Sequence, residues 1–181
     1  LLHMQDLLEK YVPDQKERVT IVPGGSDRNS TIMNIADQIE SDFGEDDSHI
    51  IVTHDSVRPF VTLRIIEENI DAALACGAVD TVVEATDTIV VSEDGKGITE
   101  IPNRRKMFQG QTPQSFRLKL LKSLYHDLSE EEKEILTDAC KICVVRNQPV
   151  KLVRGEVSNL KITTISDYKI AQAMIGGNAV D

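Results

Sequence analysis

The sequence has no tryptophan and few other aromatic residues, which together fill 4% of its 181 positions. It also has no long hydrophobic run: no stretch approaches the roughly 18 consecutive apolar residues of a membrane-spanning helix, and the first residues lack a signal-peptide pattern. Cysteine is scarce, and its three residues, an odd number, fit a reducing compartment better than a disulfide framework. We therefore expect a cytoplasmic protein without membrane insertion.

Basic residues are fewer than acidic ones. The 20 Lys and Arg residues stand against 30 Asp and Glu residues, which gives a net charge of −10. Such a charge argues against a general binder of nucleic acid or anionic membranes, so the basic residues that act on a ligand should be few and local. Hydrophobic residues reach 40%, enough for a core. We expect a single domain over residues 1–181.

Strands and helices alternate along the first half of the chain, as they do in parallel α/β sheets. The pattern predicts a helix over residues 1–12, a strand at 18–23, a helix with Asn29 or Ser30 as its N-cap, a strand at 49–53, a helix at 62–76 and a strand at 78–85. Residues 86–106 then predict a protruding β-hairpin arm, with short strands at 88–92 and 98–101. The expected fold class is α/β: a Rossmann-like, mostly parallel sheet with helices on both faces.

The second half continues with a strand at 107–112 that leads into a helix near 117–125, with Pro113 as a helix-start residue. A capping box of Ser129 and Glu132 opens another helix, which restarts at 137–138. Strands at 150–153 and 160–163 and a helix at 165–177 complete the prediction. Cys140 and Cys143 share a helix face without a second Cys/His pair near them, which favours a structural role over a metal site.

The apolar run at 50–53 ends in Asp55 and Arg58. In open α/β sheets ligands bind beyond the carboxyl ends of the strands. A carboxylate is a ligand that Mg²⁺ prefers, and a guanidinium matches phosphate oxygens, so the pair indicates phosphate chemistry. An ordinary strand-end salt bridge is the alternative interpretation.

Three further segments carry polar groups at strand or helix ends. Residues 23–31 combine glycines with a helix start, residues 109–116 supply amides and hydroxyls, and Lys161 follows Asn159 in a strand-like segment. Each could bind a phosphorylated ligand. Each could also be structural, as a capped turn in the first two cases and as an exposed lysine in the third.

The order and spacing of these motifs resemble the cytidylyltransferases that activate sugar-alcohol phosphates, namely the ribitol-5-phosphate enzymes of teichoic-acid synthesis and the methylerythritol-phosphate enzymes of isoprenoid synthesis. The resemblance covers residues 1–175 and rests on segments 24–31, 53–59, 77–81, 87–88, 110–114, 137–138 and 159–161. Segments 110–116 and 137–141 look like the ribitol branch. The Gly-rich triphosphate loop that opens this family has no match in residues 1–20, so we expect the chain to be N-terminally incomplete.

The resemblance implies a role for particular residues. It assigns CTP binding to Gly25, Ser26 and Thr31, catalysis to Asp55, Arg58 and Lys161, the Mg²⁺ ion to Asp55, and the sugar phosphate to Arg58, Thr112 and Thr137. Thr88 and Arg104 match residues of the arm, which in this family crosses a two-fold axis to complete the partner's site in a homodimer.

The expected reaction is in-line attack of a sugar-alcohol phosphate on the α-phosphorus of Mg²⁺-CTP. With D-ribitol 5-phosphate it gives CDP-ribitol and pyrophosphate for teichoic-acid or related cell-surface polymers. Two alternatives remain open at this point: a methylerythritol 4-phosphate cytidylyltransferase, and a non-catalytic nucleotide-sugar-binding protein.

Overall fold

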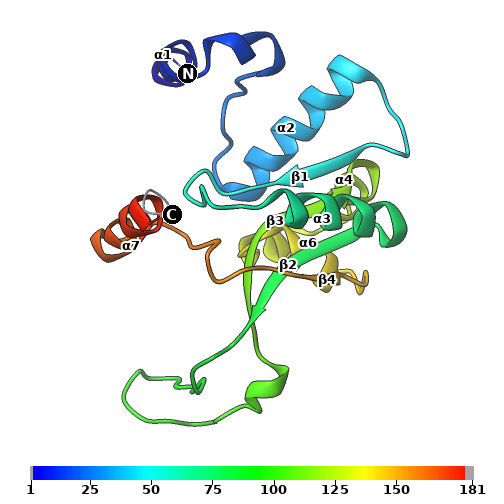
Figure 1. Cartoon of the computed structure of the whole chain (residues 1–181). Coiled ribbons are helices and arrows are strands. Elements are labelled where there is room, and N and C mark those ends of the chain that lie inside the picture. Colours follow the sequence, from blue (N-terminus) through cyan, green and yellow to red (C-terminus); the bar gives the residue numbers. More distant parts are fainter. Residues whose placement is uncertain (1, 178–181) are drawn as a thin grey trace.

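A sheet of four strands forms the centre of the computed structural model, which describes residues 2–177 (Figure 1). The strand order is β1-β3-β2-β4, with β1 at Ile50–Thr53, β2 at Ala78–Glu84, β3 at Phe108–Arg117 and β4 at Lys151–Arg154. Because β3 is antiparallel to both β1 and β2, and β2 is parallel to β4, three of the strands run in one direction. The predicted α/β fold is confirmed, with β3 as the reversed strand.

Helices cover both faces of this sheet. On one face α3 (Leu63–Cys76) buries small residues against β2 and β4, in a cluster of Ala72, Ala73, Val79 and Val153. The other face carries α2 (Arg28–Phe43), α4 (Leu118–His126) and α6 (Ala139–Val145), whose apolar sides meet around the fully buried Phe116. The short α5 (Glu130–Glu134) begins at the predicted capping box. Alternating side chains of β2 therefore face two different layers.

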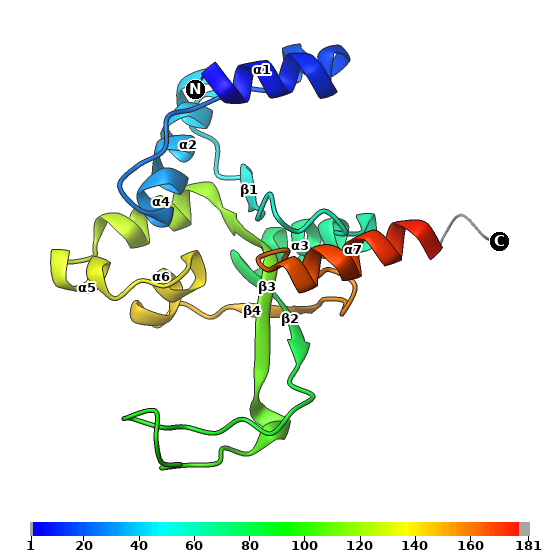
Figure 2. The same ribbon diagram turned by 90° about the vertical axis from the view of Figure 1, so that its left-hand side faces the viewer.

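Both ends of the described chain lie away from this core (Figures 1 and 2). Helix α1 (Leu2–Tyr11) and the 3₁₀ helix η1 (Pro13–Arg18) have no buried residue, and α7 (Ile165–Gly177) keeps several large apolar side chains exposed. The predicted helices at 1–12 and 165–177 are present, although residue 1 lies outside the described residues. None of the helices over residues 2–177 is long and apolar enough to cross a membrane.

Several predicted boundaries are wrong. Residues 19–23 are irregular, because no described strand lies beside them to pair with. Helix α2 is capped by Asp27, whose carboxylate accepts a hydrogen bond from the Ser30 N–H, and not by Asn29 or Ser30. Strand β3 continues through Pro113, which therefore does not start a helix. Residues 160–163 form a loop, whose Ile162 N–H donates to the Val57 carbonyl.

The arm between β2 and β3 protrudes from the sheet, as predicted (Figure 2). Its two short strands reduce to one bridge, between Val91 and Glu100, followed by the 3₁₀ helix η2 (Arg104–Lys106). Val90, Val91, Ile98 and Ile101 are 39–62% exposed there. A two-stranded ribbon without a surface to pack on has little stability of its own, which accounts for the short pairing.

Candidate functional site

Asp55 lies just beyond the carboxyl end of β1 and is surrounded by three cationic side chains. Its Oδ1 accepts from Arg28 Nη1 at 2.6 Å, while Oδ2 lies 3.1 Å from Lys161 Nζ and 3.4 Å from Arg58 Nε. The Asp55 side chain is only 8% exposed. The structure thus brings together all three residues that the sequence assigned to catalysis, and adds Arg28 to them.

The loop that carries Asp55 and Arg58 is fixed by hydrogen bonds to β3. The Asp55 N–H donates to Thr112 Oγ1 at 3.0 Å, and that hydroxyl also lies 3.0 Å from His54 Nδ1. His54 Nε2 lies 2.9 Å from the Arg58 carbonyl. Thr112, assigned to the sugar phosphate from the sequence, therefore also holds the Asp55 backbone in place.

Asn159 connects the Lys161 loop to the same framework. Its side chain is fully buried, its Nδ2 donates to the Thr112 carbonyl at 2.8 Å, and its own carbonyl accepts from Arg58 Nη1 at 2.8 Å. Lys161 is thus held near Asp55 by a loop and not by the strand that the sequence predicted. Because a buried amide that loses its partners is costly, Asn159 fixes this loop firmly.

The cations keep Asp55 ionised. Burial alone would raise its pKa, but hydrogen bonds from Arg28 and Lys161, with the attraction of their charges, outweigh burial and lower the pKa of Asp55 to about 2. The salt bridge between Asp55 and Arg58 that the alternative interpretation required is present, at 3.4 Å. Asp55 makes this contact together with those to Arg28 and Lys161. Three cations around one carboxylate are more than an ordinary strand-end salt bridge requires.

A cleft of about 620 Å³ lies between the loop at 24–31 and β1. Its lining includes Gly25, Ser26 and Thr31, the residues assigned to CTP, together with Arg28 and residues of β1. The Gly25 N–H donates to Thr31 Oγ1 at 2.9 Å, and a side chain on Gly25 would collide with Ser30, because its Cβ would lie 2.2 Å from Ser30 Oγ. Glycine is therefore required for this close approach of loop and helix.

A second cleft, of about 190 Å³, opens on the other side of Arg28. All of its lining residues are polar, charged or glycine: Arg28, Asp55, Arg58, Gly110, Gln111, Thr112, Gln114, Thr137, Asp138 and Lys161. The assigned residues Arg58, Thr112 and Thr137 all border it. Arg28 borders both clefts, so a charged group bound in either one can reach its guanidinium.

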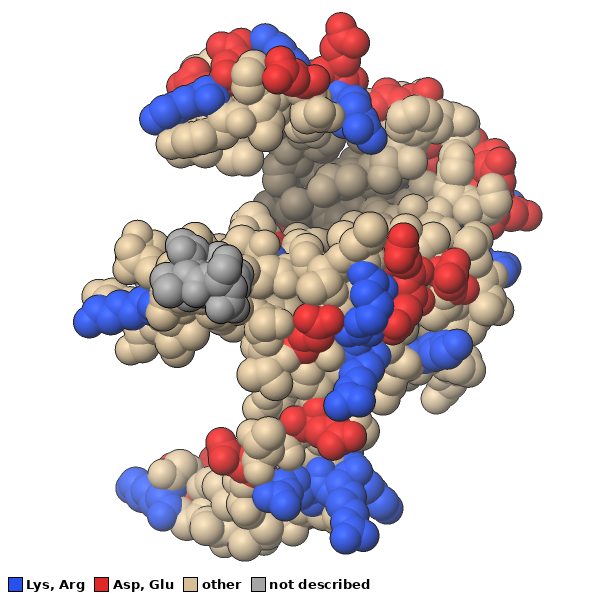
Figure 3. Space-filling view, viewed as in Figure 1, with Lys and Arg blue, Asp and Glu red and all other residues tan. Residues whose placement is uncertain are grey.

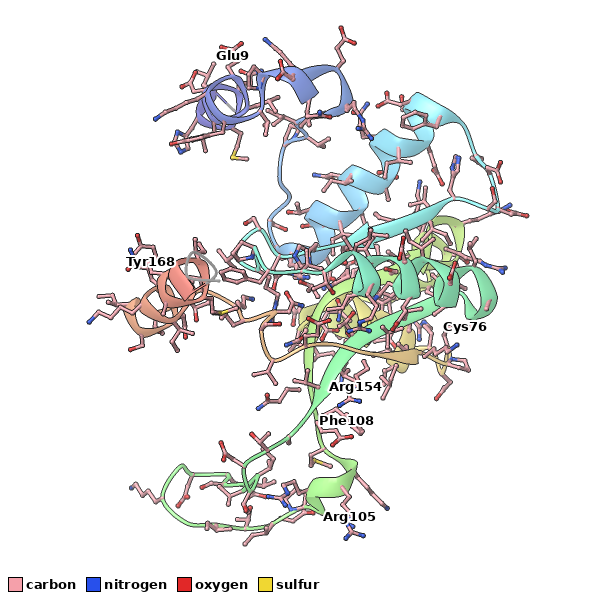
Figure 4. The ribbon with its side chains drawn as sticks, in the orientation of Figure 1. Glu9, Cys76, Arg105, Phe108, Arg154 and Tyr168 are labelled. Atoms are coloured by element: carbon pink, nitrogen blue, oxygen red, sulfur yellow. The ribbon has the colours of Figure 1, made fainter. Side chains whose placement is uncertain are left out.

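Thr88 and Arg104 are not brought to these clefts. Both belong to the arm, where Arg104 Nη1 donates to the Thr86 carbonyl at 2.9 Å, and Figure 4 shows the neighbouring Arg105 far from the end of β1. The space-filling view in Figure 3 shows Lys and Arg side chains gathered on this part of the arm. Within one chain the arm takes no part in the site.

The sequence did not assign Arg28 or Gln114 to the site, although both line its clefts, nor Asp80, which lies behind Gln114. Arg28 belongs to the loop at 24–31, but nothing in the sequence placed it beside Asp55. Asp80 and Gln114 are direct cross-strand partners on β2 and β3, and Gln114 Nε2 donates to Asp80 Oδ1 at 3.0 Å. An aspartate inside an apolar strand was the available signal for Asp80.

Cys140 and Cys143 are free and buried on α6, as a structural role predicts. Burial raises the pKa of both thiols, that of Cys143 to about 11. Within residues 2–177 no group of three or more His, Cys, Asp or Glu side chains is placed to hold a metal ion. Asp55 is the acidic side chain nearest to the three cations, and as a single carboxylate it suits Mg²⁺, which commonly takes one or two protein carboxylates and completes its shell with substrate phosphates and water.

The sequence profile of the IspD family, 2-C-methyl-D-erythritol 4-phosphate cytidylyltransferase, matches residues 2–177. The chain belongs to this family. Similar solved structures include the 4-diphosphocytidyl-2C-methyl-D-erythritol synthase of Anaerococcus prevotii, with 28% identity, a TM-score of 0.76, and coverage of 96% of this chain and 73% of that one. The 2-C-methyl-D-erythritol 4-phosphate cytidylyltransferase of Thermus thermophilus shows 26% identity, a TM-score of 0.71 and coverage of 84% and 71%.

The corresponding enzyme of Francisella tularensis, at 23% identity and a TM-score of 0.73 with coverage of 82% and 68%, shares the fold. Membership of the family confirms the predicted enzyme class, a CTP-dependent cytidylyltransferase. It does not confirm ribitol phosphate as the acceptor, because the family and these structures are named for methylerythritol phosphate.

Proposed function

We propose that this cytidylyltransferase transfers the cytidylyl group of CTP to D-ribitol 5-phosphate. The observation that carries the choice of acceptor is the lining of the 190 Å³ cleft, which has no aliphatic or aromatic side chain. Ribitol presents a hydroxyl on every free carbon, whereas methylerythritol carries a methyl group that an all-polar lining does not match. The likeness of segments 110–116 and 137–141 to the ribitol branch supports the same acceptor.

Methylerythritol 4-phosphate is the second candidate, and the comparisons favour it. The family profile and the solved structures are named for this substrate. The two candidates carry the same phosphate group and differ in the carbon chain. Arg28, Arg58 and Lys161 can therefore contact the phosphate of either one.

In the proposed mechanism the 620 Å³ cleft holds the cytidine part of CTP, with Gly25, Ser26 and Thr31 at its wall. Arg28 then lies between the nucleotide and the acceptor, where its guanidinium can contact the phosphates of both. Arg58 and Lys161, positioned by Asp55 and Asn159, hold the acceptor phosphate oxygen in line with the α-phosphorus. Catalysis of this kind is positioning plus charge stabilisation, and it needs no nucleophilic side chain.

Asp55 is the residue proposed to bind Mg²⁺, together with the phosphates of CTP. The bound ion would offset the negative charge that grows on the departing pyrophosphate. Its three cationic neighbours keep Asp55 ionised and oriented before a ligand arrives. Arg28 and Lys161, which are 39% and 45% exposed, can move from the carboxylate to phosphate oxygens.

We also propose a homodimer in which the arm completes the partner's site through Thr88 and Arg104. The arm and α7 expose apolar side chains that such a dimer would cover, including Ile98 at 62%, Ile101 at 60% and Ile165 at 78%. A second copy of the chain would cover such surfaces symmetrically.

A pyrophosphate-release assay with CTP, Mg²⁺ and each acceptor tests the proposal. D-ribitol 5-phosphate should give a kcat/KM at least about fivefold above that of 2-C-methyl-D-erythritol 4-phosphate, since one misplaced polar contact costs about 1–3 kcal/mol. Equal turnover of the two, or the reverse order, contradicts the choice of ribitol. No pyrophosphate from either acceptor contradicts the proposed reaction itself.

A further inference from the structure

The cleft beside Arg28 has two chemically different ends. Arg28, Arg58 and Lys161 gather around Asp55 and define one end. Gln114 and Asp138, which line the same cleft and lie near Asp80, define the other. Asp80 stands behind Gln114 on the neighbouring strand, as its cross-strand partner. A ligand that fits both ends must carry an anion at one end and hydrogen-bond donors at the other.

Asp80 is a half-buried carboxylate with one side-chain donor. Its Oδ1 accepts from Gln114 Nε2 at 3.0 Å, and no other side chain among the described residues donates to it, although the Thr81 backbone N–H also favours its ionised form. Burial disfavours the ionised form of Asp80 and raises its pKa, and the charge of Asp138, at the start of α6, adds to this effect. Asp138 caps α6 by accepting from the Lys141 N–H through Oδ1, which leaves its other oxygen available.

Gln114 supplies an independent sign that a donor is missing. The residue is 3% exposed and borders the cleft, yet its Oε1 is buried without a hydrogen-bond partner. A buried amide oxygen without a donor is unfavourable. Because the ionised Asp80 carboxylate can only accept, the Gln114 amide turns its NH₂ group toward Asp80 above a pH of about 6, and its Oε1 is then left as an acceptor without a donor.

Gly110 leaves the approach to Asp80 open. It lines the cleft on β3, and a Cβ added there would lie 3.7 Å from Asp80 Oδ2, an ordinary contact distance with no clash. A methyl group at this position would therefore fit the fold, and it would stand against the free carboxylate oxygen.

We propose that Asp80, Gln114 and Asp138 form a hydroxyl-binding end of the acceptor site, where they accept hydrogen bonds from the polyol carbons farthest from the phosphate. The two carboxylates and the Gln114 Oε1 offer acceptors, and one of the two Gln114 N–H groups is already donated to Asp80, so the cluster favours O–H groups and disfavours a second anion. Asp80 also acts as a positioning residue for the Gln114 amide. This inference rests on the proposed function, because it deepens the assignment of that cleft to a sugar-alcohol phosphate.

Calorimetric binding of D-ribitol 5-phosphate and of glycerol 3-phosphate tests the site without relying on turnover. Both ligands carry the same phosphate group, but glycerol 3-phosphate is too short to reach the far end. The intact protein should bind D-ribitol 5-phosphate at least about tenfold more tightly, the value of one or two hydrogen bonds to charged or buried acceptors.

Gly110→Ala and Asp80→Asn should each reduce this preference to about twofold or less while leaving the affinity for glycerol 3-phosphate and for CTP unchanged. Gly110→Ala is included because its added methyl group fits the fold, so the test does not depend on Asp80→Asn folding correctly. Gly176→Ala on α7, where an added Cβ meets nothing within 4 Å, is the matched control and should keep the preference for D-ribitol 5-phosphate. Equal binding of the two ligands by the unaltered protein overturns the site, as does a preference that survives in both variants. Pyrophosphate release, measured separately, reports on the proposed function alone.

Discussion

Arg28 and Asp55, 27 residues apart in the sequence, form an ion pair of 2.6 Å between Nη1 and Oδ1 that joins the start of α2 to the end of β1. Arg28 is also the residue that lines both clefts. A guanidinium in this position can stabilise charge on phosphates that enter from either side.

We therefore expect Arg28→Ala to lower kcat by about 10²-fold or more, because a preorganised cation is lost from the reacting phosphates. Arg28→Lys should recover only part of the loss, since an ammonium cannot make the two parallel contacts of a guanidinium. Steady-state release of pyrophosphate measures both. Arg18→Ala, at an exposed arginine of η1, is the control; a fall in its activity as large as that of Arg28→Ala would contradict the assignment.

Asp55→Asn removes the charge that the three cations share. Turnover should fall by about 10²-fold or more, and the concentration of Mg²⁺ needed for half-maximal activity should rise, because a neutral amide binds Mg²⁺ poorly and no longer orients Arg28 and Lys161. The fold should persist, since Asp55 lies outside both hydrophobic clusters. Near-native turnover with an unchanged Mg²⁺ requirement would leave Asp55 as a structural salt-bridge residue.

The apolar periodicity of the sequence predicted β1, α3, β2 and α4 to within about two residues, because each has a face that the core buries. It failed for β3 beyond Thr112, where a run of amides and hydroxyls looks like a turn. Those groups are satisfied by distant partners: Gln111 Nε2 donates to the Glu156 carbonyl and Gln114 to Asp80. A polar strand in the middle of a sheet has no local signal of its own.

The site shows the same limit. Asp55 and Arg58 could be predicted because both follow a recognisable strand, and Lys161 because of its motif. Arg28 could not, because its contact with Asp55 depends on where the start of α2 packs against the end of β1. The Asp80–Gln114 pair could not, because it depends on the insertion of β3 between β1 and β2. Thr88 and Arg104 stay predictions, because the surface proposed to receive the arm would belong to a second copy of the chain.

The arm should hold two chains together. Ile98→Asp combined with Ile101→Asp places two charges among side chains that are 62% and 60% exposed in one chain, and we expect them to be buried in the dimer. Sedimentation or light scattering should show a dimer for the intact protein and a monomer for the double variant, with activity lost in parallel. Phe43→Asp, at a 74% exposed residue at the end of α2, is the matched control that should stay dimeric. A monomeric but fully active intact protein would contradict the arm's role.

Asp80 should make the protein less stable as the pH rises from about 4 to about 6. Burial raises its pKa from 3.8 to about 6 against the hydrogen bond from Gln114, and the charge of Asp138 adds to the rise. Cys140, which also lies near Asp80, stays protonated in this range because burial raises its pKa. Between these pH values the native state holds more protons than the unfolded chain, so the free energy of unfolding falls as the pH increases.

Asp80→Asn removes this dependence while keeping the size of the side chain. The displaced pKa corresponds to at most about 3 kcal/mol, and solvent access to the half-buried group reduces this to about 1–2 kcal/mol. Urea unfolding at pH 4, 5, 6 and 7 should therefore show the variant gaining about 1–2 kcal/mol relative to the unaltered protein between the lowest and highest pH. The lowered pKa of Asp55, about 2, affects both proteins alike and acts below pH 4. Asp71→Asn, at an exposed aspartate on α3, is the control, and its free energy of unfolding should change with pH as that of the unaltered protein does. If the free energy of unfolding of Asp80→Asn shows the same pH dependence, the raised pKa of Asp80 is contradicted. Burial of this carboxylate beside Asp138 then does not destabilise the fold as the structure implies.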